Sequence, residues 1–238
     1  MFRAILDILF PPLCHICRAF IPAAGNIHLC ASCREGITPV VSPLCDLCGV
    51  PFATTDGIDH RCGHCCTVPP RFTAARTALL FDGPVRDLIH RFKYDRRVQL
   101  SRPLGLLTAE ALAPWVTAAA ADLVMPVPLH IRRLRQRGFN QAVLLGQVLA
   151  REWCLPLDRT TLRRIRWTEP QINLAADQRA ANVRGAFAVK DPPRVEGRSI
   201  ILVDDVYTTG STVVECSRVL RGAGAAEVRV VTVARAVV

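Results

Sequence analysis

The chain has 238 residues, of which half are hydrophobic and 21% are charged, and its formal net charge is +10 with a pI of about 9.4. This length fits one domain of ordinary size with a smaller one beside it, and the composition excludes a disordered or low-complexity protein. Lys93 and Lys190 are the only lysines, so nearly all of the positive charge is arginine. Guanidinium groups match phosphate geometry, which favours an anionic partner, although a GC-rich genome would give the same bias.

The first ten residues include an apolar stretch, Ile5–Phe10, that Asp7 interrupts. The stretch is too short to cross a bilayer, and no small-residue cleavage site follows it. No other segment reaches transmembrane length without charged residues. We therefore expect a protein with no membrane span and a cytoplasmic location, where its eleven cysteines would not form disulfides.

Nine of the eleven cysteines lie before residue 67, and eight of these form four C-x-x-C pairs separated by 12, 11 and 13 residues. A C-x-x-C turn places two thiolates at the separation that a tetrahedral Zn²⁺ requires. Four such turns predict two closed, structural zinc sites per chain. The predicted ligands are Cys14, Cys17, Cys30, Cys33, Cys45, Cys48, Cys62 and Cys65.

The spacing leaves the pairing of these turns open. Sequential pairing gives two zinc ribbons, whereas cross-bracing joins the first pair with the third and the second with the fourth. Cys66 could replace Cys65 as a ligand, and disulfides or an iron–sulfur cluster are the less favoured interpretations. A segment of this size with few large apolar residues needs cross-links, through metal ions or covalent bonds, in order to fold. We expect a zinc-binding module over residues 1–68, followed by a proline-containing linker at 67–71.

Beyond the linker, residues 72–238 alternate between strand and helix patterns and form the second predicted domain. In chain order the patterns predict a strand at 73–81, helices at 84–97 and 103–120, a short buried strand at 123–128, a helix at 139–152, an Arg-rich irregular stretch at 160–185 with a short helix at 174–183, a strand at 200–203, a helix at 211–221 and a strand at 228–233. Such alternation predicts an α/β domain with a doubly wound, mostly parallel sheet.

The continuous apolar run at 200–203 ends in two adjacent carboxylates, Asp204 and Asp205. Ligands of open α/β sheets bind at the carboxyl ends of strands, and small residues before a helix let backbone N–H groups approach an anion. The predicted phosphate cradle consists of Thr208, Thr209, Gly210, Ser211 and Thr212. Two acids beside a phosphate make sense where the same ligand also offers hydroxyl groups or a metal such as Mg²⁺.

The string from residue 200 to residue 212 resembles the phosphoribosyl-pyrophosphate (PRPP) signature of type I phosphoribosyltransferases at every defining position. The resemblance implies a type I phosphoribosyltransferase-like fold. It also implies that Asp204 and Asp205 hold the ribose hydroxyls as catalytic residues, that the Thr-Gly-Ser loop holds the 5′-phosphate, and that Mg²⁺ accompanies PRPP. The competing interpretation is a capped turn that opens an ordinary helix.

Further strings narrow the resemblance. The segments 126–130 and 137–142, together with the leading C-x-x-C pairs, resemble the ComF family of competence-associated proteins over nearly the whole chain. The resemblance implies that the loop after Val127 meets pyrophosphate and that residues 163–185 form a lid, where arginines would contact phosphates or nucleic acid. The implied anion contacts of the first loop are His130, Arg132, Arg133 and Arg137. Any one of these arginines could instead belong to a solvated helix face.

Three functions stay open from the sequence. The first is a phosphoribosyltransferase-like protein that binds PRPP or a related phosphorylated ribose and handles single-stranded DNA during uptake, alongside other competence proteins. The second is an active phosphoribosyltransferase with an unidentified acceptor, and the third is a PRPP sensor without catalysis. Related enzymes carry a hood over the accepting base, and here we expect only the zinc module to be available for that role. Aromatic residues make up only 6% of the chain, which predicts little base stacking.

Overall fold

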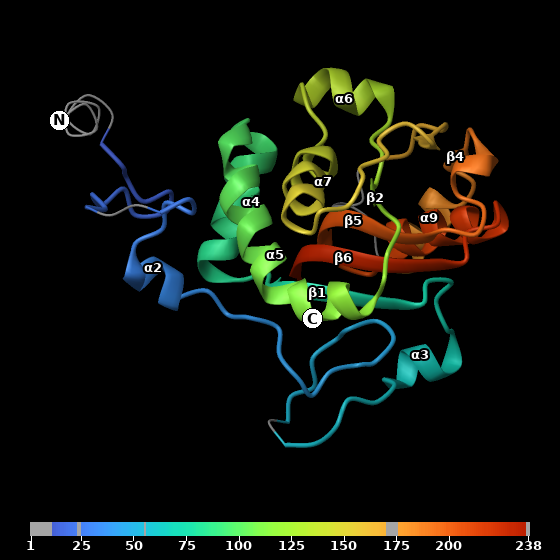
Figure 1. Ribbon diagram of the computed structural model, residues 1–238, viewed down its shortest axis with the longest axis horizontal. Helices are drawn as coiled ribbons and strands as arrows, with labels where there is room; N and C mark the ends of the chain where they lie inside the picture. Colours follow the sequence, from blue (N-terminus) through green and yellow to red (C-terminus); the bar gives the residue numbers. More distant parts are fainter. Residues whose placement is uncertain (1–10, 23–24, 55, 170–175, 237–238) are drawn as a thin grey trace.

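The structure is a computed structural model that describes residues 11–22, 25–54, 56–169 and 176–236 (Figure 1). The apolar stretch Ile5–Phe10 and the start of the helix expected at 174–183 lie outside the described residues. The described elements, in chain order, are α2 (Ala31–Glu35), α3 (Gly63–Thr67), β1 (Ala74–Leu80), α4 (Gly83–Tyr94), α5 (Ser101–Ala118), β2 (Leu123–Pro126), α6 (Ile131–Arg137), α7 (Gln141–Glu152), β3 (Leu162–Arg164), α8 (Ala176–Val183), β4 (Phe187–Val189), β5 (Ser199–Tyr207), α9 (Ser211–Gly222) and β6 (Glu227–Arg235).

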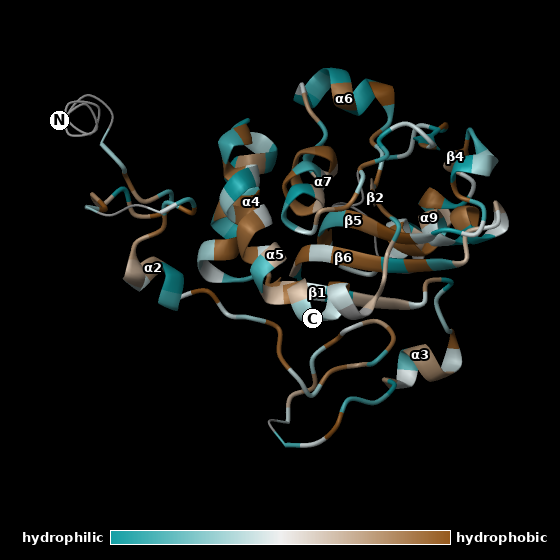
Figure 2. Cartoon of the chain, viewed as in Figure 1, coloured by the Kyte–Doolittle hydropathy of each residue, from teal (hydrophilic) through white to brown (hydrophobic). Residues whose placement is uncertain are grey.

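Four strands form one parallel sheet in the order β1-β6-β5-β2, which confirms the predicted doubly wound architecture (Figure 1). The two central strands, β5 and β6, are apolar over most of their length, as expected of strands covered on both faces (Figure 2). A separate antiparallel pair, β3 with β4, was not anticipated because each strand has only three residues. Helix α6 was also missed, since its sequence IRRLRQR has no apolar periodicity.

Helices cover both faces of the sheet and divide the core in two. On one face, Val213, Cys216 and Leu220 of α9 pack against alternate residues of β2, β5 and β6. On the other face, α4, α5 and α7 bury a second cluster that includes Leu88, Phe92 and Leu145. Alternation along each strand sends neighbouring side chains to opposite clusters, so that Ile200 joins the first and Ile201 the second.

The cysteine-rich segment closes the edge of the sheet at β1. Its backbone runs along this strand, where Val40 N donates to Ala78 O over 2.9 Å and Leu80 N donates to Thr38 O over 2.8 Å. A further bond of 2.7 Å joins Ala75 N to Leu47 O. These contacts satisfy backbone groups that an open edge strand would expose to other chains.

The two halves of the cysteine-rich segment pack on opposite faces of the sheet. In the first half, Ile16, Ile27 and Leu29 contact the core under α4 and α5, and Arg34 forms an exposed ion pair of 3.2 Å with Glu110. In the second half, buried cysteines belong to the core beneath α9. The division into residues 1–68 and 72–238 stays a prediction, and these contacts indicate that the two parts share their hydrophobic cores.

Candidate functional site

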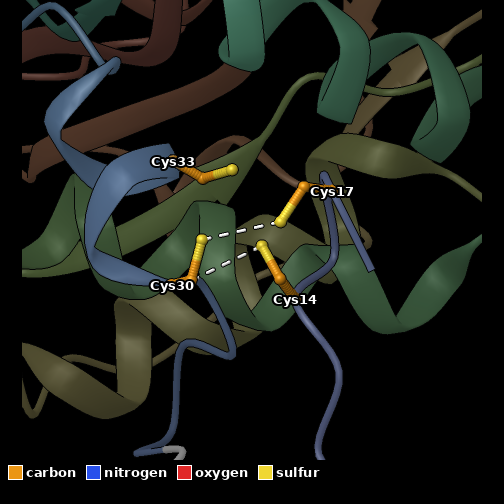
Figure 3. A group of neighbouring side chains, drawn as sticks. All are labelled: Cys14, Cys17, Cys30 and Cys33. Carbon is orange, nitrogen blue, oxygen red and sulfur yellow. Dashed lines mark hydrogen bonds between the residues drawn. The ribbon is translucent and has the colours of Figure 1, made fainter. Parts of the chain in front are cut away.

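The eight cysteines of the four C-x-x-C pairs come together as two groups. The thiol sulfur atoms within each group lie within 4.8 Å of one another: Cys14, Cys17, Cys30 and Cys33 form the first group, and Cys45, Cys48, Cys62 and Cys65 the second. Figure 3 shows the side chains of the first group converging, with Cys17 Sγ 3.6 Å from Cys30 Sγ. Pairing is therefore sequential, which excludes cross-bracing. All eleven cysteines are free of disulfides, and Cys66 is exposed outside the second group.

Backbone amides point at sulfur in both groups. The amides of Cys48 and Cys62 each donate to Cys45 Sγ over 3.4 Å. Burial acts to raise the pKa of the Cys45 thiol, but these amides outweigh it and bring the pKa to about 6. The amides of Ile16 and Cys30 likewise donate to Cys14 Sγ over 3.5 Å. Four thiols at this separation, with amide donors stabilising the thiolate form, fit a closed tetrahedral Zn²⁺ site of the structural kind.

A cavity of about 440 Å³ lies at the carboxyl end of β5, and its volume is in the range of small-molecule sites. The loop after β5 and the first turn of α9 form one part of its lining, and α4 and the segment of α6 form others. Of the residues predicted in the acid pair, the phosphate cradle and the loop after Val127, those that line it are Asp204, Asp205, Thr208, Gly210, Ser211, Thr212, Arg133 and Arg137. Thr209, His130 and Arg132 are outside this lining, and a role for them in ligand binding stays a prediction.

The two carboxylates stand in different surroundings. Asp205 is 4% exposed, Lys93 Nζ lies 2.9 Å from its Oδ2, and no described group gives that oxygen a well-directed hydrogen bond. Burial, together with the nearby charge of Asp205, raises the pKa of Asp204 to about 7. Asp204 Oδ1 accepts a bond of 2.9 Å from the amide of Asp205. The pair thus keeps buried oxygen atoms that a ligand hydroxyl can approach.

The loop that opens α9 has the form expected of a phosphate cradle. Gly210 adopts φ +75°, and a Cβ atom there would overlap Tyr207 Oη, so both backbone and packing require glycine. Thr209 Oγ1 and Ser211 Oγ are hydrogen-bonded at 2.8 Å, which fixes the two hydroxyl groups next to the helix N-terminus. The backbone amides of that first turn carry the positive end of the helix dipole.

The predicted cationic residues separate into internal and external sets. Arg137 donates to Gln141 Oε1 over 2.6 Å beside the cavity, and Arg164 is partly buried, with its guanidinium 5.3 Å from the Phe187 ring centroid. Arg166 donates to the carbonyl groups of Asn182 and Arg184 and therefore supports its own loop. By contrast, Arg132 and Arg135 of α6 and Arg163 of β3 are exposed and lie outside the lining of the cavity, and these three form the external set.

His130 caps α6 rather than lining the cavity. Its side chain accepts a 3.3 Å bond from the amide of Arg132, and Gly138, at φ +88°, ends the helix. The His130 ring also meets the Trp167 ring edge-on at 5.4 Å, which holds the segment after β3 beside α6. The sequence signal that could have revealed this helix is the glycine eight residues beyond His130, since glycine commonly ends a helix in the left-handed conformation.

Several lining residues carried no predicted role. On α4 they are Arg86, Ile89, His90, Lys93 and Tyr94. The strings 88–90 and 92–94 belong to the family resemblance, but the sequence assigns them no role, because the position of α4 over the cavity depends on the pairing of β1 with β6. Arg164 was expected to meet phosphates from a lid, and the structure places it in the lining.

The second cysteine group is linked to the phosphate loop through Arg235. This buried arginine donates to Cys48 O over 2.6 Å, and its guanidinium lies 4.2 Å from the centroid of the Tyr207 ring. Tyr207 in turn fills the space beneath Gly210. The second cysteine group, the end of β5 and the end of β6 therefore meet at the side chain of Arg235.

Comparisons with known sequences match two parts of the chain to known families. The family described as Double zinc ribbon domain matches residues 5–66, and the family described as Phosphoribosyl transferase domain matches residues 140–236. The chain is 38% identical to the DNA utilization protein YhgH of Escherichia coli (strain K12) over 223 residues, which are 92% of this chain and 95% of that protein. It is 32% identical to Competence protein F of Haemophilus influenzae over 225 residues, covering 91% and 96% of the two chains.

A more distant relative and a solved structure extend the comparison. Competence protein ComFC of Bacillus subtilis is 27% identical over 215 residues, with 88% of this chain and 84% of that protein covered. The B. subtilis glutamine PRPP amidotransferase complexed with ADP and GMP is 25% identical at a TM-score of 0.38, over 55% of this chain and 25% of that one. Among the described helices, none combines the length and apolarity needed to cross a bilayer.

We expect protein purified without added metal to contain two zinc ions per chain, one for each cysteine group, and Cys17→Ser and Cys45→Ser each to lose one. Because Cys45 is buried in the core beneath α9 and Cys17 is exposed, Cys45→Ser should lower the melting temperature further. Elemental analysis and thermal unfolding measure both effects, with Cys66→Ser as the control. Full zinc content in either variant would contradict the assignment.

The raised pKa of Asp204 predicts a pH-dependent loss of stability. The folded chain holds this proton up to a pH of about 7, whereas an unfolded Asp releases it near pH 4, so the free energy of unfolding falls as pH rises between these values. Asp204→Asn removes the effect. The melting temperature of the variant should exceed that of the parent at pH 8, and the gap should narrow as the pH is lowered toward 5. The prediction would be refuted if the difference in melting temperature between variant and parent did not change with pH. It would also be refuted if the exposed control Asp87→Asn showed the same trend.

Proposed function

The chain belongs to the ComF family, and on that premise we propose that it binds PRPP, or a related phosphorylated ribose, and handles single-stranded DNA during DNA uptake. The observation that carries the proposal is the shared cavity: the buried Asp205, the partly buried Asp204, the loop at the N-terminus of α9 and several cationic side chains converge on one space. A ligand that suits all of these groups must combine hydroxyl groups with phosphate groups.

PRPP has this combination. In the proposed complex, the amides and hydroxyls of residues 208–212 bind the 5′-phosphate, and the Asp204 and Asp205 carboxylates accept hydrogen bonds from the ribose 2′- and 3′-hydroxyls. Arg133 and Arg137 line the same cavity and are the proposed contacts of the pyrophosphate group. Lys93 neutralises part of the negative charge of the carboxylates, which lowers their repulsion of an anionic ligand.

Magnesium is part of this proposal. Carboxylate and phosphate oxygens are the hard ligands that Mg²⁺ prefers, and both would be present once PRPP is bound. The ion would neutralise the charge of the pyrophosphate group. Because Lys93 already lies 2.9 Å from Asp205, we expect Mg²⁺ to strengthen PRPP binding rather than to bind strongly without it.

The DNA part of the proposal rests on the external arginines and on the net charge of +10. Arg132 and Arg135 are exposed on α6, and the contact between His130 and Trp167 brings the segment that follows Arg163 close to the same helix. Helix α6 also carries Arg133 and Arg137, which line the cavity, so a strand held by its phosphates on this helix would lie near the proposed PRPP site. The relatives named for competence and DNA utilization favour this role.

Phosphoribosyl transfer is the second candidate function. It is favoured by the position of Arg133 and Arg137 in the same cavity as the two acids, where they could stabilise departing pyrophosphate. Such a reaction would break the bond between ribose C1 and pyrophosphate and form a bond from C1 to an acceptor, which would release a proton. A sensor that binds PRPP without this step would use the same residues.

We further propose that the protein acts in the cytoplasm, where free thiols can hold zinc, and that other DNA-uptake proteins are its partners. In this proposal the zinc-binding module, residues 1–68, stabilises the phosphoribosyltransferase-like domain, residues 72–238, through the shared cores on both faces of the sheet.

Calorimetry with PRPP and Mg²⁺ tests the ligand site. Asp205→Asn should weaken binding tenfold or more, because one lost charge-assisted bond is worth about 1.5–3 kcal/mol. Gly210→Ala should weaken it as well, since the new Cβ would overlap Tyr207. Gly222→Ala is the matched control on the same helix, where a Cβ meets no atom within 4 Å. Parent-like binding by both site variants would contradict the site assignment.

Fluorescence anisotropy of a labelled oligonucleotide across salt concentrations tests the DNA site. For single strands, the slope of log K against log salt is about −0.7 per neutralised phosphate, so replacing Arg132, Arg135 and Arg163 together with Ala should flatten it by about two. The control replaces Arg151, Arg159 and Arg198, which are also exposed but belong to α7 and to the segments before β3 and β5. Equal slopes for the two triple variants, or no binding at low salt, would defeat this role.

A further inference from the structure

The two cysteine groups differ in how deeply the fold encloses them. In the first group Cys17 is exposed, and Cys30 and Cys33 are half-buried. In the second group three of the four cysteines are members of the core beneath α9, and the fourth packs against it. None of the four cysteines of the first group belongs to either of the described hydrophobic cores. Two sites with the same ligand chemistry therefore differ in the access that they give to a solute.

The first group lies in a lobe, residues 11–22 and 25–36, at one end of the molecule beside α4 (Figure 1). Arg91 of α4 attaches this lobe, because it donates to the carbonyl of His15 over 2.8 Å and to that of Ile16 over 3.5 Å. Both carbonyls belong to the turn between Cys14 and Cys17. The contact with α4 therefore depends on a turn whose shape the metal would fix.

Further contacts of the lobe with the main domain are only partly buried. Ile16, Ile27 and Leu29 touch the core under α4 and α5 without being enclosed by it. A groove of about 620 Å³ lies between part of the lobe and α5, and both members of the exposed ion pair of Arg34 with Glu110 line it. Contacts of this kind allow a lobe to open while the cores of the protein remain packed.

Cys17 and Cys30 approach each other within the first group. Their sulfur atoms are 3.6 Å apart, and Figure 3 shows the two side chains pointing toward one another. The second group contains a similar approach, with 3.8 Å between the sulfur atoms of Cys48 and Cys62. Distance alone does not distinguish the two groups, so access decides which of them reacts first with a solute.

We propose that the first cysteine group is a thiol-oxidation site, at which hydrogen peroxide joins Cys17 to Cys30 in a disulfide and one zinc ion is released. The exposed Cys17 thiolate attacks a peroxide oxygen, the O–O bond breaks, and Cys17 becomes a sulfenic acid as hydroxide leaves. The Cys30 thiolate then attacks the Cys17 sulfur, which forms the S–S bond and releases a second hydroxide. The two thiolates lose two electrons, and the peroxide gains them. Only two thiolate ligands remain, too few to hold Zn²⁺ in a closed site.

The reaction leaves the rest of the molecule folded. The second group keeps its ion because it is enclosed by the core, and Arg235 holds it through the bond of 2.6 Å to the carbonyl of Cys48. Loss of the first ion frees the turn that Arg91 binds, so the lobe detaches from α4 and α5. This inference does not depend on the ligand proposed for the cavity, since neither the cysteines nor Arg91 line it.

Zinc release from the full-length protein measures the reaction. In hydrogen peroxide with a colorimetric zinc chelator, we expect one ion per chain to leave at least about tenfold faster than the second, because the buried group must open before it reacts. Peptide mapping by mass spectrometry, after alkylation of free thiols, should find Cys17 joined to Cys30. Loss of both ions at one rate, or a first disulfide that joins any other pair, would overturn the proposal.

The two exposed cysteines outside the groups provide matched controls. Cys66→Ser and Cys154→Ser each remove an exposed thiol and should leave the fast release of zinc unchanged. Slower release from Cys66→Ser would overturn the proposal, because it would place the first attack beside the second group.

Limited digestion with trypsin follows the lobe itself. Oxidation should speed cleavage after Arg18 and Arg34, which lie in the lobe, and should leave cleavage after Arg61 unchanged, because Arg61 is next to Cys62 of the second group. All three arginines are exposed, so accessibility alone does not separate them. Treatment with a thiol reductant and zinc should reverse the effect. Equal acceleration at Arg61, or none at Arg18, would overturn the proposed opening of the lobe.

Discussion

The buried side chain of Arg235 connects the parts of this protein that lie farthest apart in the sequence. It is 6% exposed, donates to the carbonyl of Cys48 in the second cysteine group, and stacks on Tyr207 beneath the phosphate loop. A guanidinium is costly to bury without compensating charge. A Zn²⁺ ion held by the four thiolates of the second group would carry a net negative charge and would supply this compensation, because the Arg235 guanidinium lies 3.8 Å from Cys48 Sγ.

This arrangement makes the cysteine-rich segment part of the main fold. Its backbone completes the edge of the sheet at β1, the first cysteine group adjoins the core under α4 and α5, and the second enters the core under α9. The segment is thereby fixed on both sides of the strand that precedes α4. Because α4 follows β1 directly, the wall that it presents to the cavity depends on the same edge contacts.

The carboxylate pair illustrates a conflict between stability and ligand binding. Burial and mutual repulsion raise the pKa of Asp204 to about 7, so both acids cannot be ionised at neutral pH without cost. Lys93 reduces that cost at Asp205, and the sheet register fixes the strand in which both acids lie, where Asp204 pairs with Thr232. Strain of this kind is tolerated where a ligand or metal relieves it, which agrees with the proposed binding of PRPP and Mg²⁺.

The sequence alone determined the eight zinc ligands, the α/β order of elements and the string from residue 200 to residue 212, because each is a local pattern of spacing or periodicity. Only the tertiary structure decided that the cysteine pairs are sequential, since equal spacings permit either arrangement. It also decided which arginines reach the cavity and which face outward, and it brought Lys93 to Asp205 across 112 positions of sequence. Strand pairing sets these contacts: β1 lies beside β6, the last strand, and no local pattern encodes the neighbour of a parallel strand.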